Sequence, residues 1–294
     1  MSKKETQKGR KSKKKQKPAP KPQFLLNPIH NKVMDYHVYV MSPAEKLLYS
    51  LIAFVVGGIV SQMFYGGLFM KDGEPTTLTN ISNVAVFVIV GLVAGKIFLP
   101  IRTAQLLEKR QKELRKQFRD MLESITASLS ANDTVVQAFH YAYRDMQMQY
   151  SDNAYITKEL KQITEALKNN VDLELMVEDF AKRSACEDIE DFSNVFKVSY
   201  GPGGRMKDVM RQTHSVICEK MQIEDEIASK ISANKLELNI ITCAPILIVA
   251  MLKMSSADFA ANFATPVGVV VNTLAIVLFV VAYRMGQKIV DIKG

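Results

Sequence analysis

Two apolar stretches lie toward each end of the sequence, and a charged, amphipathic stretch separates the two pairs. The apolar stretches are Leu47 to Met70, Val84 to Ile101, Leu238 to Leu252 and Val267 to Tyr283. About 20 apolar residues in a helix cross the roughly 30 Å hydrocarbon core of a bilayer. We therefore predict four transmembrane helices, two within residues 42–101 and two within residues 237–294.

The first of these helices has a start signal in the sequence. Ser42 suits the N-cap, Pro43 suits the first helical position, and Glu45 can return a hydrogen bond to the cap. In the second span, Gly91 and Gly95 lie four residues apart and leave one helix face free for close packing in lipid. We expect this face to pack within the chain.

Residues 102–236 repeat apolar side chains with the period of a helix and show no strand-like alternation. Six helices are predicted, with their first periodic or capping positions near Thr103, Thr134, Ile156, Leu173 and Ile189 and just after Gly204. Gln137 can complete a capping box with Thr134. The first four helices are expected to end at Asn132-Asp133, at Ser151-Asp152-Asn153, at Asn169-Asn170 and near Ala185. The last helix is expected to continue into the third span. The predicted fold class is all-α, with four transmembrane helices and a cytoplasmic six-helix antiparallel bundle.

Positive charge is concentrated beside the apolar stretches. The net charge is +8, and twelve Lys or Arg fall within the first 46 residues. Residues 1–41 are therefore expected to form a basic tail, disordered or at the membrane interface, facing lipid headgroups. The tail lacks interleaved aromatic residues and any groove-reading motif, so nucleic acid is not an expected partner.

The distribution of Lys and Arg also predicts the orientation. The N-terminal tail, Arg102 to Arg119 and the residues after Tyr283 are basic, whereas the two short loops between spans hold one Lys each. Because basic flanks stay in the cytoplasm, both termini and residues 102–236 are expected on the cytoplasmic side of the inner membrane.

Sequence motifs for catalysis, metals and cofactors do not occur. Cys186, Cys218 and Cys243 form no CxxC pair, and the four histidines show no HExxH spacing, so we expect free thiols and no metal. The chain is not expected to be an enzyme or to carry a cofactor.

A glycine cluster and two acidic runs are further candidate sites in the charged middle of the chain. Gly201-Pro202-Gly203-Gly204-Arg205 lacks the terminal GK[ST] of a phosphate-binding loop, and a helix–helix turn is the preferred interpretation. The acidic runs at 187–191 and 224–226 are typical of a solvated helix face, and a contact surface for a basic partner is the alternative.

Three segments carry a resemblance to a known family. These are ITASLSANDTVVQAFHYA (125–142), MVEDFAKRS (176–184) and GPGGRMKDVMRQTHSVICEKM (201–221). Together they resemble the type II secretion F-domain family, and the single domain between two pairs of spans is most like an inner-membrane platform protein of tight-adherence (Tad, or Flp) pili. Asn132 stands where the family usually has Gly, and Met206 stands at a Leu position.

The resemblance implies a function without catalysis. The protein would couple a cytoplasmic assembly ATPase to the insertion of pilin subunits in a type IV pilus or type II secretion machine. Expected partners are that ATPase, the pilins, membrane lipids, and either a sister platform subunit or a second copy of the chain. Gly201, Gly203, Gly204 and Arg205 are expected to set the angle at which the sixth helix begins, and Arg115, Arg119 and Arg183 are candidate contacts for the ATPase.

Two other function classes remain open from the sequence. A membrane-anchored signalling adaptor would combine spans with a helical stalk, usually with longer heptads and an external sensor domain. A transporter subunit would place polar or broken helices at mid-membrane, and Pro245 and Asn272 are the residues that favour this class.

The predicted orientation can be tested with reporter fusions. An enzyme reporter that is active only outside the cytoplasm should be inactive at residue 150 and active within the loop at 71–82. Activity at residue 150 would contradict the assignment of residues 102–236 to the cytoplasm.

Overall fold

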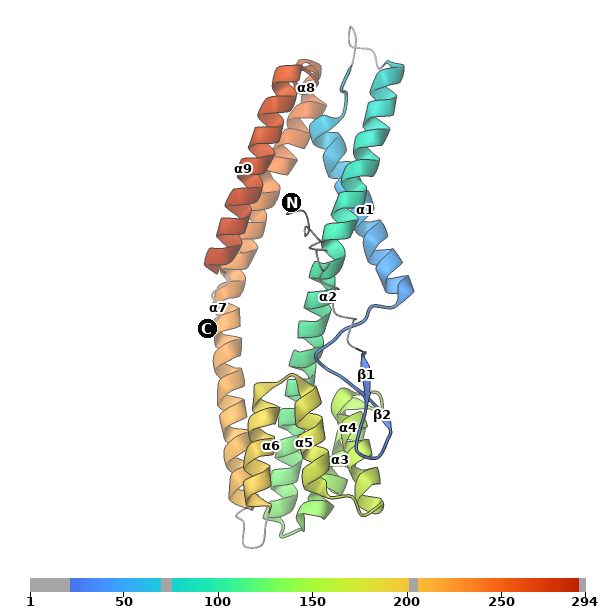
Figure 1. The fold of residues 1–294 in the computed structure, drawn as a ribbon. Helices are drawn as coiled ribbons and strands as arrows, with labels where there is room; N and C mark the ends of the chain where they lie inside the picture. Colours follow the sequence, from blue (N-terminus) through green and yellow to red (C-terminus); the bar gives the residue numbers. More distant parts are fainter. Residues whose placement is uncertain (1–21, 70–75, 201–205, 291–294) are drawn as a thin grey trace, which may run out of the picture.

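In a computed structural model, which describes residues 22–69, 76–200 and 206–290, the chain is elongated and almost entirely helical (Figure 1). The elements are, in chain order, β1 (Phe24–Leu26), β2 (Lys32–Met34), α1 (Pro43–Tyr65), α2 (Thr77–Ser130), α3 (Val135–Tyr150), α4 (Tyr155–Lys168), α5 (Leu173–Ser184), α6 (Glu187–Ser199), α7 (Met206–Ser255), α8 (Ala257–Phe263) and α9 (Pro266–Val290). One end of the molecule holds the compact group α3 to α6, and the other holds the apolar helices.

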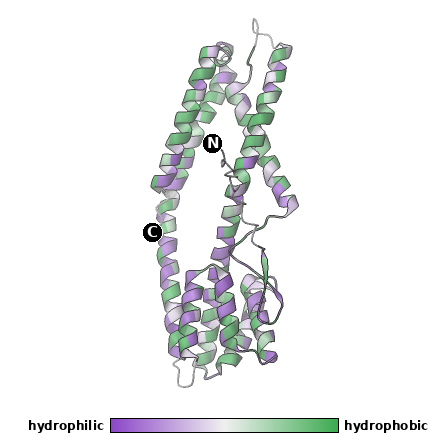
Figure 2. Ribbon diagram, in the orientation of Figure 1, coloured by the Kyte–Doolittle hydropathy of each residue, from purple (hydrophilic) through white to green (hydrophobic). Residues whose placement is uncertain are grey.

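Among the described residues, four helices are long and apolar enough to cross a membrane: α1, α2, α7 and α9. Their apolar segments carry almost no buried residues inside the molecule, so their side chains face outward. Figure 2 shows these segments as mainly hydrophobic ribbon and the opposite end as mixed. The four predicted spans are therefore present as helices of suitable length and composition, and they support a membrane protein.

Helices α2 and α7 each belong to both ends of the molecule. α2 has 54 residues and α7 has 50, and each runs without interruption from an apolar segment into a charged one. The predicted continuation of the sixth helix into the third span is confirmed. The predicted separation of a second span from a helix starting at Thr103 is wrong, because α2 continues through Pro100 and Arg102.

The C-terminal half of α2, helices α3 to α6 and the N-terminal half of α7 pack around one hydrophobic core, and we call this part the helical domain. The core contains Leu114, Phe118 and Ile125 from α2, Phe139 from α3, Ile156 and Leu160 from α4, Val177 and Phe180 from α5, Phe192 and Phe196 from α6, and Met210 and Ile217 from α7. The Phe118 and Phe192 rings meet edge to face with centroids 5.3 Å apart. The apolar stripes of the sequence thus face one another.

Positive φ angles mark the ends of four helices in this domain. Asn132 follows α2 with φ 68°, Ser151 follows α3 with φ 75°, Asn170 follows α4 with φ 55°, and Ala185 follows α5 with φ 54°. Asparagine tolerates the left-handed conformation better than other residues with a side chain. All four helix ends were predicted from the sequence and are confirmed.

Both predicted capping boxes are also present. The Glu45 amide donates to Ser42 Oγ at 3.2 Å, and the Ser42 amide donates to Glu45 Oε2 at 2.8 Å. Thr134 and Gln137 form the same pair of bonds at the start of α3. Two otherwise unpaired N–H groups are satisfied at each helix start.

The N-terminal segment differs from its prediction. Residues 1–21 lie outside the described residues. The expectation of a disordered tail up to residue 41 is wrong for residues 22–41, and the alternative of a position at the membrane interface stays a prediction. There β1 and β2 form an antiparallel hairpin, with Phe24 opposite Met34, and Tyr36 and Met41 are buried. Three-residue strands give too short an alternation to recognise, and this hairpin acquires its order by packing against the helical domain.

The apolar helices form two pairs, α1 with α2 and α7 with α9. The pairs touch at the end far from the helical domain, where Lys253 Nζ donates to the Met63 carbonyl oxygen at 2.9 Å and Asn272 Nδ2 donates to the Phe64 carbonyl oxygen at 3.3 Å. The short helix α8 lies at that end, where the sequence indicated a loop. Figure 1 shows α2 and α7 apart between this contact and the helical domain.

Close packing of α1 on α2 depends on Gly91, so we expect Gly91→Leu to destabilise the pair. A Cβ at residue 91 would lie 2.6 Å from Phe54 Cδ2 and 2.9 Å from the Phe54 carbonyl oxygen. Overpacking of this kind costs about 1–3 kcal/mol, which thermal unfolding in detergent would detect. Val93→Leu is the control, because Val93 is 51% exposed. Equal unfolding midpoints for the two variants would refute the role of Gly91.

Candidate functional site

A buried ion pair joins α4 and α5 in the helical domain. The Arg183 guanidinium donates to both carboxylate oxygens of Glu159, at 3.0 and 2.7 Å, and its Nε donates to Asp179 Oδ2 at 2.8 Å. The side chains of Arg183 and Glu159 are each 4% exposed. The two parallel hydrogen bonds fix the relative orientation of the two side chains, and the pairing neutralises both buried charges.

The N-terminal hairpin is fastened to this ion pair. The Tyr36 hydroxyl donates to Glu159 Oε1 at 3.0 Å, and the Tyr36 amide donates to the Arg183 carbonyl oxygen at 2.9 Å. Arg183 Nη1 donates in return to the Met34 carbonyl oxygen at 2.9 Å. Because the chain continues from Tyr36 into α1, these bonds hold the start of the first apolar helix against the helical domain.

The electrostatics keep the donors of this network protonated. Burial raises the pKa of Tyr36 well above its ordinary value, and the charge of Glu159 raises it further. Burial alone would lower the pKa of Arg183, but the hydrogen bonds and charges of Glu159 and Asp179 outweigh it, so the pKa is raised. Both groups therefore remain donors across the physiological pH range.

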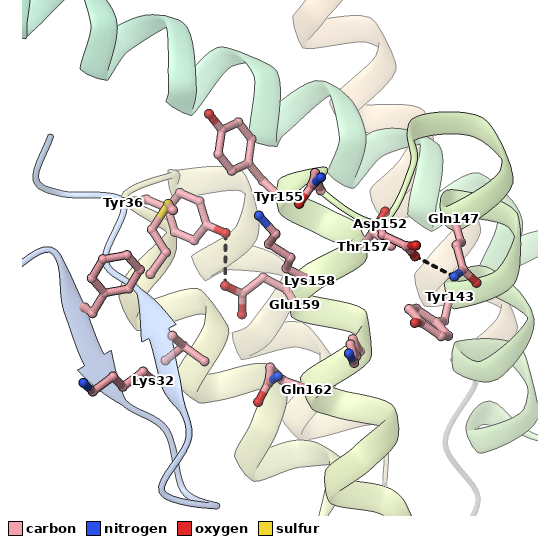
Figure 3. A pocket seen from close by; sticks show the side chains of 15 residues that line it. Lys32, Tyr36, Tyr143, Gln147, Asp152, Tyr155, Thr157, Lys158, Glu159 and Gln162 are labelled. Atoms are coloured by element: carbon pink, nitrogen blue, oxygen red, sulfur yellow. Dashed lines mark hydrogen bonds between the residues drawn. The ribbon is translucent and has the colours of Figure 1, made fainter. Parts of the chain in front are cut away.

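A solvent-open cavity of about 710 Å³ lies between the hairpin and helices α3 and α4 (Figure 3). Its lining side chains include Lys32 and Tyr36 from the hairpin segment, Tyr143 and Gln147 from α3, Asp152 from the following loop, and Tyr155, Lys158, Glu159 and Gln162 from α4. The carboxylate of Glu159 is neutralised by Arg183, which does not suit it to general-base catalysis. This arrangement holds the hairpin segment against α4 and α5.

A second charged cluster joins α2, α6 and α7. Arg115 Nε donates to Asp188 Oδ2 at 2.5 Å, Lys220 Nζ donates to Asp188 Oδ1 at 2.8 Å, and Arg115 Nη1 donates to Glu224. Asp188 lies in the first turn of α6, where the helix dipole favours a carboxylate. Its side chain is 6% exposed. We call Arg115, Asp188, Lys220 and Glu224 the Asp188 cluster.

One helical turn from Arg115, a further polar group links α2 to α3. Arg119 pairs with Asp120 at 2.6 Å, and the Tyr150 hydroxyl donates to the same carboxylate. Burial, together with the hydrogen bond to Asp120, raises the pKa of Tyr150 to about 12. Arg119 keeps 31% of its side chain exposed.

The candidate ATPase contacts therefore do not form one surface. Arg115 and Arg119 both border a groove of about 600 Å³ between α2 and α7. Arg183 is buried in its own ion pair and offers no surface to a partner in this structure. Gly201, Gly203, Gly204 and Arg205 lie outside the described residues, so their expected role stays a prediction.

Sequence reasoning missed the partners Tyr36, Glu159 and Lys220. It placed Asp188 on a solvated helix face, which is wrong for this residue, because its buried carboxylate pairs with Arg115 and Lys220. For Glu159 the sequence held a usable signal: it lies three residues after Ile156 and four before Ile163, on the apolar face of α4. A charged residue on such a face needs a buried partner. The identity of that partner depends on the tertiary fold, and no sequence spacing connects Glu159 to Tyr36.

The cysteines and histidines remain separate from these networks. The three cysteines are free thiols, and Cys218 Sγ lies 3.4 Å from His214 Nε2 one turn away on α7. Within residues 22–69, 76–200 and 206–290, no group of three or more His, Cys, Asp or Glu is arranged to hold a metal ion.

Comparison of the chain with family models, with curated proteins and with solved structures finds no match.

The buried ion pair generates a stability prediction. Glu159→Gln leaves Arg183 without its main counter-charge, and breaking a buried pair in this way costs about 3–5 kcal/mol. Glu108→Gln is the matched control, because the Glu108–Lys112 pair is exposed and worth about 0–1 kcal/mol. Urea unfolding of the full chain in detergent would measure both, and proteolysis within residues 22–41 would report release of the hairpin. Equal losses for the two variants would show that the buried network does not hold the hairpin.

Proposed function

We propose that this chain is an inner-membrane platform protein of a type IV pilus of the Tad or Flp kind, or of a type II secretion machine. In this role it couples a cytoplasmic assembly ATPase to the insertion of pilin subunits. The resemblance of segments 125–142, 176–184 and 201–221 to the F-domain family gives the class of machine. The continuity of α2 and α7 gives the physical mechanism and is the observation that carries the proposal.

Coupling needs a rigid connection between the part that is moved and the part that acts in the membrane. α2 and α7 provide two such connections, about 80 Å and 75 Å long at 1.5 Å per residue. The Asp188 cluster ties both helices to α6 inside the helical domain. A force on the helical domain is thus transmitted to α2 and α7 together.

The proposed orientation places the helical domain and both termini in the cytoplasm. Support comes from the Lys and Arg that follow the apolar segments of α2 and α9, among them Arg102, Arg284 and Lys288. A cytoplasmic motor would then reach the protein at its helical domain.

The proposed motor contact is the groove between α2 and α7. Its α2 side carries Arg119 and three exposed lysines, Lys109, Lys112 and Lys116, beside Glu108 and Glu113, and its α7 side carries Glu224 and Asp225. A groove with both signs of charge suits a partner surface of complementary charge pattern, with acidic side chains opposite the α2 lysines. Arg115 also lines the groove, and its ion pair with Asp188 fixes its position. Arg183 does not line the groove.

One backbone detail supports the resemblance. The F-domain pattern usually has Gly at the position of Asn132, and Asn132 has φ 68°, in the region where glycine is favoured. The family's preference for glycine at this position is therefore explained by the left-handed backbone conformation, which Asn adopts most easily after Gly.

The alternative functions have less support. Asn272, which favoured a transporter subunit, hydrogen-bonds to the Phe64 carbonyl oxygen between helices and is accounted for by packing. A signalling adaptor usually has a sensor domain outside, whereas only short segments connect α1 to α2 and α7 to α9.

Interrupting α7 tests the coupling mechanism. Lys230 is exposed and lies between the Asp188 cluster and the apolar segment. Lys230→Pro removes a backbone hydrogen bond and kinks the helix, which destabilises it by about 3 kcal/mol. Lys230→Ala leaves the helix straight. In the native host, Lys230→Pro should reach the membrane and co-purify with the assembly ATPase, yet assemble no pili. Lys230→Ala should behave as wild type.

Two outcomes would contradict the proposal. Normal pili in the Lys230→Pro strain would show that α7 does not transmit force. A strain lacking the whole chain that still assembles pili and secretes normally would show that the protein is no platform.

A further inference from the structure

A solvent-open cavity of about 700 Å³ lies between α2 on one side and α7 and α9 on the other. Its lining consists of Gln105 from α2, Lys235, Leu238 and Asn239 from α7, and Arg284, Gln287 and Lys288 from α9. It shares no lining residue with the hairpin cavity, and it adjoins the groove between α2 and α7, since Gln105 lines both.

The depth of this cavity matches the edge of the membrane. Leu238 begins the apolar segment of α7, and Gln105 lies four residues beyond Ile101, the last residue of the apolar run in α2. Arg284 and Lys288 occupy the last two turns of α9. Figure 2 shows the change from hydrophobic to hydrophilic ribbon at this level. Lipid headgroups lie at this depth.

The chemistry of the lining suits an anion. Three of its residues are cationic, three are amides, and none of the described residues that line it is Asp or Glu. Arginine and lysine bind phosphate oxygens by charge-assisted hydrogen bonds, and side-chain amides can donate to the same oxygens. Basic pockets between membrane helices on the cytoplasmic side bind anionic headgroups in this way.

Apolar surface continues from the cavity toward the membrane. Ile241 on α7, three residues beyond Leu238, and Val281 on α9, three residues before Arg284, are 59% and 52% exposed. Acyl chains attached to a bound headgroup can lie along these side chains. A phosphate with an attached hydrocarbon chain therefore fits this site better than a free anion.

We propose that this cavity binds the headgroup of an anionic phospholipid, with Arg284 and Lys288 as the main phosphate ligands. The bound lipid connects α9 and α7 to α2 near the helical domain, at the opposite end of the spans from the Lys253–Met63 contact. The proposal depends on the membrane spans and is independent of the pilus function.

Native mass spectrometry of the full chain in detergent tests the proposal. Dioleoyl phosphatidylglycerol and tetraoleoyl cardiolipin should bind at least about tenfold more tightly than dioleoyl phosphatidylcholine. Arg284→Gln with Lys288→Gln should weaken binding of the anionic lipids about 30-fold. Arg284→Lys with Lys288→Arg keeps both charges and should retain most of the binding.

A matched control separates this site from general attraction between charges. Lys46→Gln with Lys96→Gln removes the same net charge from exposed side chains of α1 and α2 outside the cavity and should leave lipid binding unchanged. Equal losses in the two double variants would overturn the proposal, as would equal binding of phosphatidylcholine or binding of inorganic phosphate as tight as that of the lipid. If the Arg284 and Lys288 double variant fails to insert, Lys288→Gln alone should weaken binding about fivefold, and an unchanged affinity would overturn the proposal.

Discussion

The structure depends on the requirement that backbone N–H and C=O groups stay paired where the chain passes between lipid and water. Inside a bilayer only a helix or a closed barrel meets this requirement for one chain. α2 and α7 meet it by continuing as helices into the helical domain, so their backbone bonding pattern continues as the environment of their side chains changes. The boundary between lipid and water is therefore marked in α2 only by a change of side chains, from the apolar Ile101 to the charged Arg102, and the helix continues across it.

The helical domain combines an apolar core with two charged networks that act as fixed connections. Arg183 and Glu159 hold the N-terminal hairpin through Tyr36, and Asp188 holds α2, α6 and α7 together. Buried ion pairs add little net stability compared with apolar packing, but they tolerate few alternative arrangements because each charge needs its partner. The networks thus determine how the first, second and third apolar helices are oriented on the domain.

The sequence predicted local features well and tertiary partnerships poorly. Ser42 with Glu45, Thr134 with Gln137, and the helix ends at Asn132 and Asn170 depend on a few neighbouring residues, and all are present. The hairpin at residues 22–41 was missed because three-residue strands carry little periodicity and their order comes from contacts with distant residues. For the same reason Arg183 was expected at the surface: its charge is visible in the sequence, but its partner Glu159, 24 positions away, is not.

The contact between the two helix pairs at the far end has a geometric consequence. Lys253 lies 33 residues beyond Lys220, about 50 Å along α7. A tilt of about 5° between α7 and α2 at the Asp188 cluster would displace that end by about 4 Å, enough to break the hydrogen bond from Lys253 to Met63. A minor rearrangement in the helical domain would then separate the α1–α2 pair from the α7–α9 pair at the opposite membrane surface, unless α7 bends. Pro245 is the position at which α7 bends most easily, because proline lacks the N–H of a helix hydrogen bond.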